Sequence, residues 1–251
     1  MFDFFDSDLF TILYPLLLTG MIITGFIIAS KYYYKRQVAW KPSGIENGIL
    51  GLFGLLLSFT LLLSGNAQKE RTIMVHHMGD GIVQMKTAAD VLAPEDRVAV
   101  YAYLRRHIDL HLALYEKEMT SSVQLINQLN DLNENFWPTL HYKNDSAEFN
   151  QDIHTLLPIY NQLNSASFKL TYSYNERIPP LIYLLITLSS WLLAILVGFM
   201  NGFYEKRHYL VPLIYLVIVG LMMQAIRDID NPYKGSVKPK YENLKNLRTL
   251  L

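Results

Sequence analysis

The sequence predicts an all-α integral membrane protein, with four transmembrane helices and a helical extramembrane body inserted between helices 2 and 3. Two observations lead to this prediction. Only 18% of the residues are charged, against about 25% in a typical soluble domain. The charged residues also avoid four segments altogether, namely residues 9–29, 48–67, 181–200 and 209–226. A helix needs roughly 20 apolar residues to cross a bilayer, and each segment is close to that length.

The four segments divide the chain into predicted parts. We expect an N-terminal transmembrane pair over residues 1–67, a helical body over 68–180, a C-terminal transmembrane pair over 181–226 and a tail over 227–251. Four crossings place both termini and the body on the same side of the bilayer. The N-terminus has no basic residue, unlike a secretory signal peptide. Both the first loop, residues 30–47, and the tail are basic, so the charges leave the orientation open.

The body is predicted to be helical throughout, because no segment alternates between apolar and polar residues as a half-buried strand does. The second transmembrane helix is expected to continue into the body as far as Leu92. Pro94 and the acids after it mark the start of the next helix. That helix is expected to bury one face made of Val98, Tyr101, Leu104, Ile108, Leu112 and Tyr115. Further helices are expected over residues 122–135 and 152–177.

Several classes of protein are disfavoured by what the sequence lacks. The 22 basic and 22 acidic residues balance, whereas a nucleic-acid-binding domain is expected to be basic. Cysteine is absent, which excludes disulfides, thiolate zinc sites and cysteine nucleophiles. The sequence contains neither a phosphate-binding glycine loop nor a Gly-x-Ser-x-Gly elbow. We therefore expect no enzyme, no cofactor and no nucleic-acid partner.

Small residues recur along one face of the second transmembrane segment, at Gly51, Gly54, Ser58 and Gly65. Such a stripe lets helices approach each other closely in a bilayer, which is the first interpretation. The second interpretation is a pore lining made of Gly51, Gly54, Ser58, Phe59 and Leu62. Narrow uncharged segments of this kind can gate by dewetting. Both interpretations hold together if an oligomer arranges its second transmembrane helices around an axis.

A pair of histidines in the body could bind a metal ion. His107 and His111 are four residues apart, so they share one face of a helix. Either His76 or His77 could supply a third ligand. The simpler interpretation is that these are surface or interface histidines without a metal, because no Glu lies between the pair as in zinc proteases.

The end of the last transmembrane segment is rich in polar residues. Charges so close to a membrane are costly unless they are paired or solvated. One interpretation is an ion pair between Arg227 and an Asp, followed by a capped turn in which Pro232 ends the helix and Gly235 completes the turn. The other is a cation site, with Asp228 and Asp230 as oxygen ligands.

The tail also carries a family resemblance. Residues 229–239 are Ile-Asp-Asn-Pro-Tyr-Lys-Gly-Ser-Val-Lys-Pro, with Asp230, Pro232 and Gly235 at the positions that match. This segment resembles the Leu-Asp-x-Pro-Phe-x-Gly-x-Val-x-Pro string of the bacterial bestrophin-like membrane proteins, a family long described as a domain of unknown function.

A second motif and the order of the parts extend this resemblance over nearly the whole chain. Trp137 and Pro138 match the Glu-Trp-Pro of the family, although Phe136 stands where the family usually has the acid. A role for that acid is therefore not carried over to this chain. Two transmembrane segments, a helical body and two further segments follow one another in the order that the family shows.

The resemblance implies a fold and a function. Bestrophins proper are pentameric anion channels whose second transmembrane helices line the neck and whose helical bodies lie in the cytoplasm. For this chain the resemblance implies a homo-oligomer, by analogy a pentamer, in the bacterial inner membrane, with an inorganic anion as the transported ion. It also implies that the body lies in the cytoplasm. The basic first loop, by contrast, favours a cytoplasmic position for that loop and the opposite side for the body.

Three hypotheses follow in order of preference. The first is an oligomeric, anion-selective channel with the second transmembrane helix along the pore. The second is a non-conducting membrane scaffold or sensor whose body binds a partner or a ligand. The third is a metal-dependent enzyme built on the histidines. A symmetric oligomer with the second transmembrane helices around its axis would distinguish the first from the second.

Overall fold

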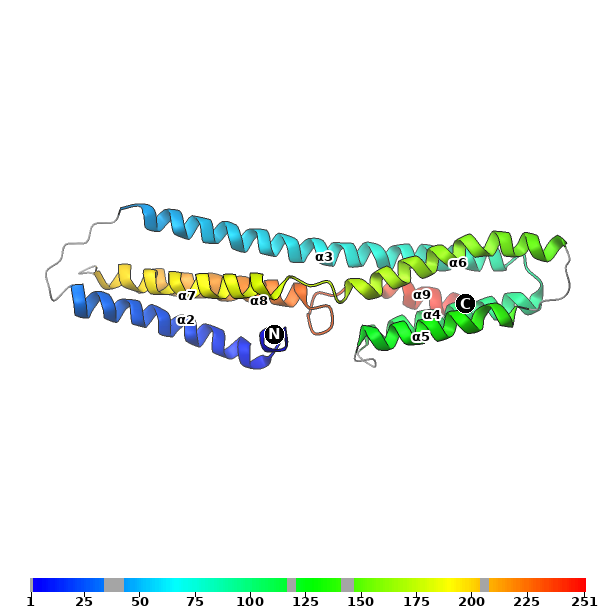
Figure 1. Cartoon of the computed structure of the whole chain (residues 1–251), viewed down its shortest axis with the longest axis horizontal. Helices are drawn as coiled ribbons and strands as arrows, with labels where there is room; N and C mark the ends of the chain where they lie inside the picture. The colour runs from blue at the N-terminus through cyan, green and yellow to red at the C-terminus, as the bar shows by residue number, and fades with distance from the viewer. Residues whose placement is uncertain (1, 34–42, 117–120, 141–146, 204–207) are drawn as a thin grey trace. The chain divides into compact units, whose positions relative to one another are not determined.

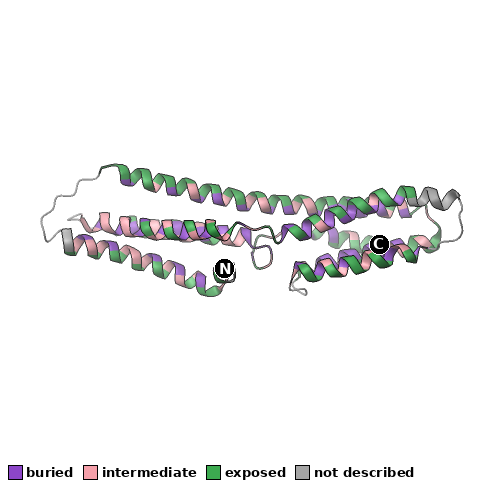
Figure 2. Ribbon diagram, in the orientation of Figure 1, coloured by how far each residue is buried: buried purple, intermediate pink, exposed green. Residues whose placement is uncertain are grey.

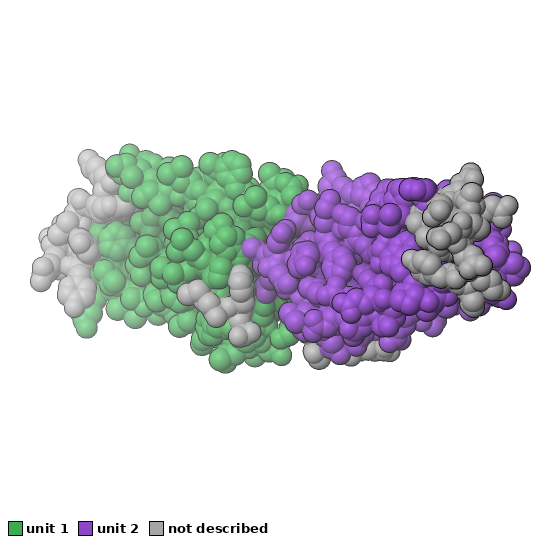
Figure 3. Space-filling model, turned by 45° about the vertical axis from the view of Figure 1, so that its right-hand side comes forward, with its two compact units in different colours: residues 1–66, 178–236 green, residues 67–177, 237–251 purple. Residues whose placement is uncertain are grey.

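The structure is a computed structural model that describes residues 2–33, 43–116, 121–140, 147–203 and 208–251. The described residues form helices and turns and no strand, which confirms the all-helical prediction for this part of the chain. They divide into two compact units, coloured separately in Figure 3. Unit 1 comprises residues 1–66 and 178–236, and unit 2 comprises residues 67–177 and 237–251. The predicted tail is thus divided between the two units.

The helices follow one another along the chain as Figure 1 labels them. Unit 1 contains α1 (Phe2–Phe5), α2 (Asp8–Ile28), the π-helical turn η1 (Ala29–Tyr33), the first part of α3 (Ile45–Ala89), α7 (Pro180–Phe203) and α8 (Leu210–Asp230). Unit 2 contains the rest of α3, α4 (Pro94–Tyr115), α5 (Ser122–Phe136), the 3-10 turn η3 (Trp137–Thr139), α6 (Ala147–Ser173) and α9 (Glu242–Leu250). As predicted, α3 continues well beyond its apolar segment.

Four of these helices are long and apolar enough to cross a membrane. They are the helix from Asp8 to Lys31, α3, α7 and α8, and they coincide with the four segments that contain no charged residue. Half of the basic loop that bears on orientation, residues 34–42, lies outside the described residues.

Helices α2 and α7 approach each other closely because glycines, which have no side chain, lie where the two helices cross. A Cβ atom on Gly198 of α7 would clash with the carbonyl oxygen of Ile22. A Cβ atom on Gly25 of α2 would clash with the carbonyl oxygen of Ile195. Small residues allow this close backbone contact between helices in a bilayer. This close contact therefore joins two of the four candidate membrane-spanning helices, α2 and α7.

Ser190 of α7 is fully buried and links three helices of unit 1. The hydroxyl of Tyr14 in α2 donates a hydrogen bond to Ser190 Oγ at 2.9 Å. The hydroxyl of Tyr215 in α8 donates to the Ser190 carbonyl oxygen at 2.7 Å. Each of these bonds gives a tyrosine hydroxyl a partner that it would otherwise lack in apolar surroundings. Together they fix how α2 and α8 are rotated about α7.

Helix α3 begins at a capping arrangement and buries one side in unit 1. The Glu46 carboxylate accepts a hydrogen bond from Ser43 Oγ at 3.1 Å, and Ile45 N donates to Ser43 Oγ at 3.3 Å. This arrangement satisfies backbone groups that have no partner within the helix. Beyond the buried Glu46 of the first turn, the buried side of this part of α3 consists of Phe53, Leu57, Thr60 and Ser64. Most other residues between Ile45 and Asn66 are exposed (Figure 2).

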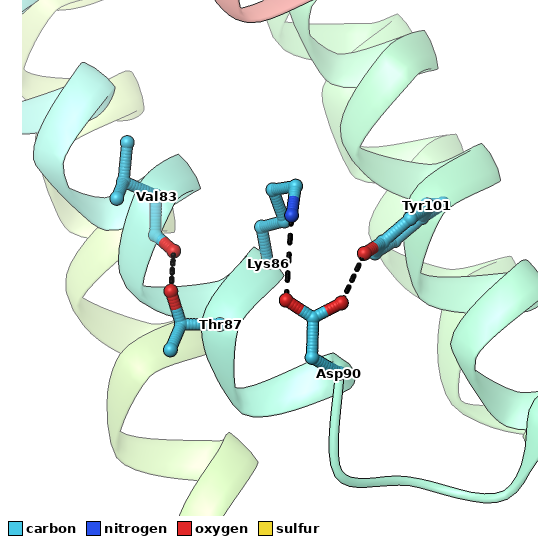
Figure 4. A network of polar contacts seen from close by, with 5 residues as sticks. All are labelled: Val83, Lys86, Thr87, Asp90 and Tyr101. Carbon is cyan, nitrogen blue, oxygen red and sulfur yellow. Dashed lines mark hydrogen bonds and ion pairs between the residues drawn. The ribbon is translucent and has the colours of Figure 1, made fainter. Parts of the chain in front are cut away.

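A polar network closes the turn between α3 and α4 in unit 2 (Figure 4). The Asp90 carboxylate, which follows α3, accepts hydrogen bonds from the hydroxyl of Tyr101 and from Lys86 Nζ, the latter at 3.3 Å. The hydrogen bond from Tyr101, assisted by Lys86, lowers the pKa of the Asp90 carboxyl below its ordinary value. Pro94 is the first residue of α4, as predicted.

The buried face of α4 differs in part from the predicted one. Leu104, Ile108 and Leu112 are buried as expected, but Val98 is 67% exposed, so the prediction was wrong there. The buried face also includes Val100, Tyr103, His107 and His111. Histidine counts as polar in a hydropathy pattern, so a face predicted from apolar residues does not include His107 and His111. The buried face that includes them is centred on a side of the helix away from Val98.

A buried arginine donates hydrogen bonds to backbone carbonyl oxygens at the C-terminal end of α6 in unit 2. Arg71 of α3 is 1% exposed. Its Nε donates to the carbonyl oxygen of Ser173 at 3.2 Å, and its Nη2 donates to that of Glu176 at 2.9 Å. Carbonyl groups at the C-terminus of a helix lack partners within the helix and carry partial negative charge. The guanidinium group therefore supplies both hydrogen bonds and a compensating charge.

Ion pairs hold α9 against α4. Lys245 Nζ lies 2.5 Å from Glu116 Oε1, and Arg248 pairs with Asp109. The two pairs are three residues apart on α9 and seven apart on α4, so they lie along one side of each helix. The C-terminal part of the predicted tail thus packs on the body.

Gly198→Ala is expected to destabilise unit 1, because the added methyl group has no space beside the Ile22 carbonyl. Overpacking of this kind costs about 1–3 kcal/mol. The midpoint of thermal unfolding of the detergent-solubilised chain should therefore fall. Gly20→Ala is the matched control, since no atom lies within 4 Å of a Cβ there. Equal midpoints for the two variants would contradict the glycine crossing.

Candidate functional site

The five residues predicted to line a pore all lie on exposed surface of α3 in unit 1. They are Gly51, Gly54, Ser58, Phe59 and Leu62. For the two bulky side chains, Phe59 and Leu62, the exposed fraction is 56% each. None of the five belongs to the buried side of the helix, so unit 1 as described leaves this surface uncovered.

The small residues of this surface do not pack against another helix of the described chain. No atom of the described chain lies within 4 Å of a Cβ built on Gly51, Gly54 or Gly65. The glycines at the crossing of α2 and α7, by contrast, lie against backbone atoms. The small-residue stripe of α3 is therefore available for contact with another chain or for lining a pore.

The exposed surface of α3 is uncharged between residues 48 and 67. The hydroxyl of Ser58 donates to the Gly54 carbonyl oxygen at 2.9 Å, so it is satisfied within its own helix. Glycine and serine leave space beside the helix, whereas Phe59 and Leu62 add bulky apolar side chains. Apolar constrictions gate by excluding water, so this surface joins a small-residue section to a section suited to such a constriction.

Asp230, at the end of α8, is fully buried. One carboxylate oxygen accepts a hydrogen bond from the backbone N–H of Ile178 at 2.9 Å. The other accepts one from the hydroxyl of Tyr183 at 3.0 Å. These bonds join the end of α8 to the start of α7. The local sequence around Asp230 gave no signal for Tyr183, which lies 47 residues away in the chain.

The residues after Asp230 form a tight turn. Asn231 Oδ1 accepts hydrogen bonds from the backbone N–H groups of Tyr233 and Lys234, each at 3.0 Å. Gly235 N donates to the Asn231 carbonyl oxygen at 2.9 Å. A Cβ on Gly235 would clash with the carbonyl oxygens of Asp228 and Asn231, so a side chain does not fit there. The turn after α8 that Gly235 completes is thus present.

The carboxylates of Asp228 and Asp230 point to different partners. Asp228 Oδ1 accepts hydrogen bonds from Ser236 N at 2.7 Å and from Ser236 Oγ at 3.0 Å, whereas Asp230 binds groups at the start of α7. Within the described ranges, no group of three or more His, Cys, Asp or Glu side chains is placed to hold a metal ion.

His107 and His111 are fully buried in unit 2. Their ring centroids are 5.3 Å apart, and His111 Nε2 lies 2.6 Å from Ser167 Oγ of α6. Both ring nitrogens of His107 lack a hydrogen-bond partner among the described residues. His76 and His77 lie on exposed surface of α3. The two rings thus belong to the interior of the body rather than to its surface.

Burial keeps both imidazoles neutral. Desolvation lowers the pKa of His107 to about 4. Desolvation, assisted by the neighbouring His107, lowers the pKa of His111 well below its ordinary value. Removing a charged ring from water is unfavourable when no partner stabilises the charge.

Phe136, which stands where the family usually has an acid, is part of an aromatic core. It is 3% exposed, and its ring centroid lies 4.3 Å from that of Tyr103 and 5.5 Å from that of Tyr160. Trp137 packs edge-on against Tyr160 at 4.9 Å, and Pro138 follows it in η3. A carboxylate among these rings would lose its solvation, so the aromatic residue suits this position.

Comparison with protein families gives a match over most of the chain. The family model described as the Bestrophin-like domain matches residues 47–243. This range covers more than three quarters of the chain and includes both sequence motifs. Comparison with curated proteins and with solved structures gives no match.

Asp230→Ala is expected to destabilise unit 1 more than Asp228→Ala. The first variant removes the acceptor of two buried hydrogen bonds, at a cost of about 1–3 kcal/mol for each buried donor. The bonds from Ser236 to Asp228 are exposed, so their loss should cost about 1 kcal/mol or less. Thermal unfolding of the two variants provides the measurement. A larger loss for Asp228→Ala would refute this assignment.

Acid is expected to destabilise unit 2 through His107. The pKa of this ring falls from an ordinary value of 6.5 to about 4 on folding, so the unfolded chain binds a proton more readily. The neutral ring contributes about 3 kcal/mol to the free energy of unfolding. This contribution is complete above the ordinary pKa and is lost as the pH falls toward the pKa of the folded chain. Thermal unfolding midpoints measured across this pH range provide the test.

The thermal unfolding midpoint of His107→Leu should change less with pH than that of the unchanged chain. Some dependence should persist, because the pKa of His111 is also lowered. His77→Leu is the control, since His77 is exposed on α3. Identical pH slopes for His107→Leu and the unchanged chain would exclude the effect.

Proposed function

Because the chain belongs to the bestrophin-like family, we propose that it forms a homo-oligomeric, anion-selective ion channel in the bacterial inner membrane. By analogy with bestrophins the oligomer is a pentamer. The exposed surface of α3 that carries Gly51, Gly54, Ser58, Phe59 and Leu62 lines the pore. The four apolar helices cross the bilayer.

The open stripe of α3 is the observation that carries this proposal. Gly51, Gly54 and Ser58 are three and four residues apart, so they fall on one side of the helix. Leu52 and Leu63, with exposed fractions of 69% and 52%, offer apolar surface on another side. A helix that lines a pore in an oligomer needs a narrow side toward the axis and apolar surface toward lipid or neighbouring subunits.

Anion selectivity rests on the family relation and is compatible with the lining. Cation channels line their pores with rings of Asp or Glu, and residues 48–67 contain neither. Bestrophins are anion channels, and this chain is related to them through the bestrophin-like family.

The second candidate function is a non-conducting membrane scaffold or sensor whose body binds a partner or ligand. A charged groove of about 690 Å³ in unit 2 favours it. Its lining includes Arg106, Asp109, Glu116, Lys245 and Arg248. Both acids are in ion pairs with α9, and Arg106 is not part of those pairs. Such a groove suits a small anionic ligand.

Ser58→Trp is expected to block conduction, because the indole group would occupy the small-residue section of the pore. Anion flux through liposomes containing the purified chain should fall nearly to that of empty liposomes. Leu213→Trp is the matched control, since Leu213 is 54% exposed on α8 and outside the proposed lining. Flux that persists unchanged in Ser58→Trp would remove the pore assignment.

The mass of the detergent-solubilised particle separates the two candidate functions. A channel lined by α3 requires a symmetric oligomer with these helices around a central axis. A monomer, or a two-fold dimer without conduction, would favour the scaffold.

A further inference from the structure

A groove in unit 1 lies between the start of α2 and the end of α8. Its volume is about 320 Å³. Most of its wall is apolar, including Phe10 and Pro15 of α2 and Leu216 and Met223 of α8. Gly220 also lines it, and no atom of the described residues outside its own helix backbone lies within 4 Å of a Cβ built there. The missing side chain therefore helps to open the groove.

Polar groups gather at one end of the groove. Arg227 is the only charged residue of the lining, and Gln224 lies three residues before it on α8. Arg227 Nη1 is 3.5 Å from the carbonyl oxygen of Ser7, just before α2. The adjacent acid, Asp228, accepts its hydrogen bonds from Ser236. The residues that line the groove thus include one cation and no carboxylate.

A further polar atom lies within the groove wall. Thr11 Oγ1 is buried and has no hydrogen-bond partner in the described part of the chain. A buried hydroxyl without a partner costs free energy. A ligand with an acceptor near the polar end would therefore be favoured here.

The dimensions of the groove match one leaflet of a bilayer. The lining on α8 extends from Leu216 to Arg227, which corresponds to roughly 16 Å at about 1.5 Å per residue. The hydrocarbon core of a bilayer is about 30 Å thick. Measured from Arg227, the groove therefore reaches about half-way through such a core, and its polar end follows the last residue of the uncharged segment.

We propose that this groove binds an anionic phospholipid, with one acyl chain along the apolar wall and the headgroup phosphate at Arg227. Basic pockets between transmembrane helices bind anionic headgroups in this manner. The proposal rests on the crossing of the bilayer by α2 and α8, which is part of the proposed function, but it does not require conduction.

Native mass spectrometry of the full chain tests this site. The purified protein is mixed with equal amounts of phosphatidylglycerol and phosphatidylcholine that carry identical acyl chains, and the lipids retained are counted. The unchanged chain should retain phosphatidylglycerol preferentially. One basic side chain near a membrane surface contributes about 1 kcal/mol to binding of an anionic lipid, so Arg227→Gln should reduce that preference about fivefold.

Two further comparisons separate the headgroup site from the acyl-chain site. Gly220→Leu should fill the groove and reduce retention of both lipids, whereas Gly20→Leu, at a similarly open position on α2, should not. Lys234→Gln, which removes an exposed charge in the turn after α8, should leave the lipid preference unchanged.

Three results would overturn the site. The first is an undiminished preference in Arg227→Gln, and the second is equal retention by Gly220→Leu and Gly20→Leu. The third is a change of particle mass in Gly220→Leu without loss of lipid, which would identify a neighbouring subunit as the occupant. A lack of anion flux in liposomes would affect only the channel proposal, because lipid retention is measured without conduction.

Discussion

The carboxylate of Asp230 connects the two ends of the C-terminal helix pair in unit 1. It accepts hydrogen bonds from Ile178 N and from the Tyr183 hydroxyl, so the end of α8 is held at the start of α7. With that end fixed, Tyr215 reaches Ser190 further along α7, and Arg227 lies beside the start of α2. A buried acid is costly unless its oxygens are satisfied. Its position at the end of α8 therefore constrains the packing of α2, α7 and α8.

Helix α3 contributes to both units with a single repeating pattern. Its buried positions recur every three or four residues, from Phe53 in unit 1 to Ala89 in unit 2, as on an amphipathic helix. In unit 1 its open sides carry glycines and leucines rather than charges. Such apolar surface suits lipid or a second chain. This part of α3 is thus one of the apolar surfaces of unit 1 that would be covered if the proposed oligomer forms.

Much of the fold could be predicted from the sequence, because charge-free segments of bilayer length and a proline before acids are local signals. The packing could not. Two buried histidines looked like polar residues, so the predicted face of α4 included Val98, which is exposed. The small-residue stripe of α3 could be predicted, because the spacing of Gly51, Gly54 and Ser58 is a local signal in the sequence. The partners of Asp230 could not, because Ile178 and Tyr183 are distant in the chain and a hydrogen bond to a backbone N–H requires no particular side chain.

The glycine crossing of α2 and α7 has a consequence for biosynthesis. Gly25 is made early and Gly198 late, with the whole body between them. A chain is synthesised at about 5–20 residues per second. The interval between the synthesis of Gly25 in α2 and that of Gly198 in α7 is therefore roughly ten seconds or longer. During that time the close-packing surface of α2 lacks its partner on α7. Assembly of the helix bundle is therefore a late event, completed only after the body has been synthesised.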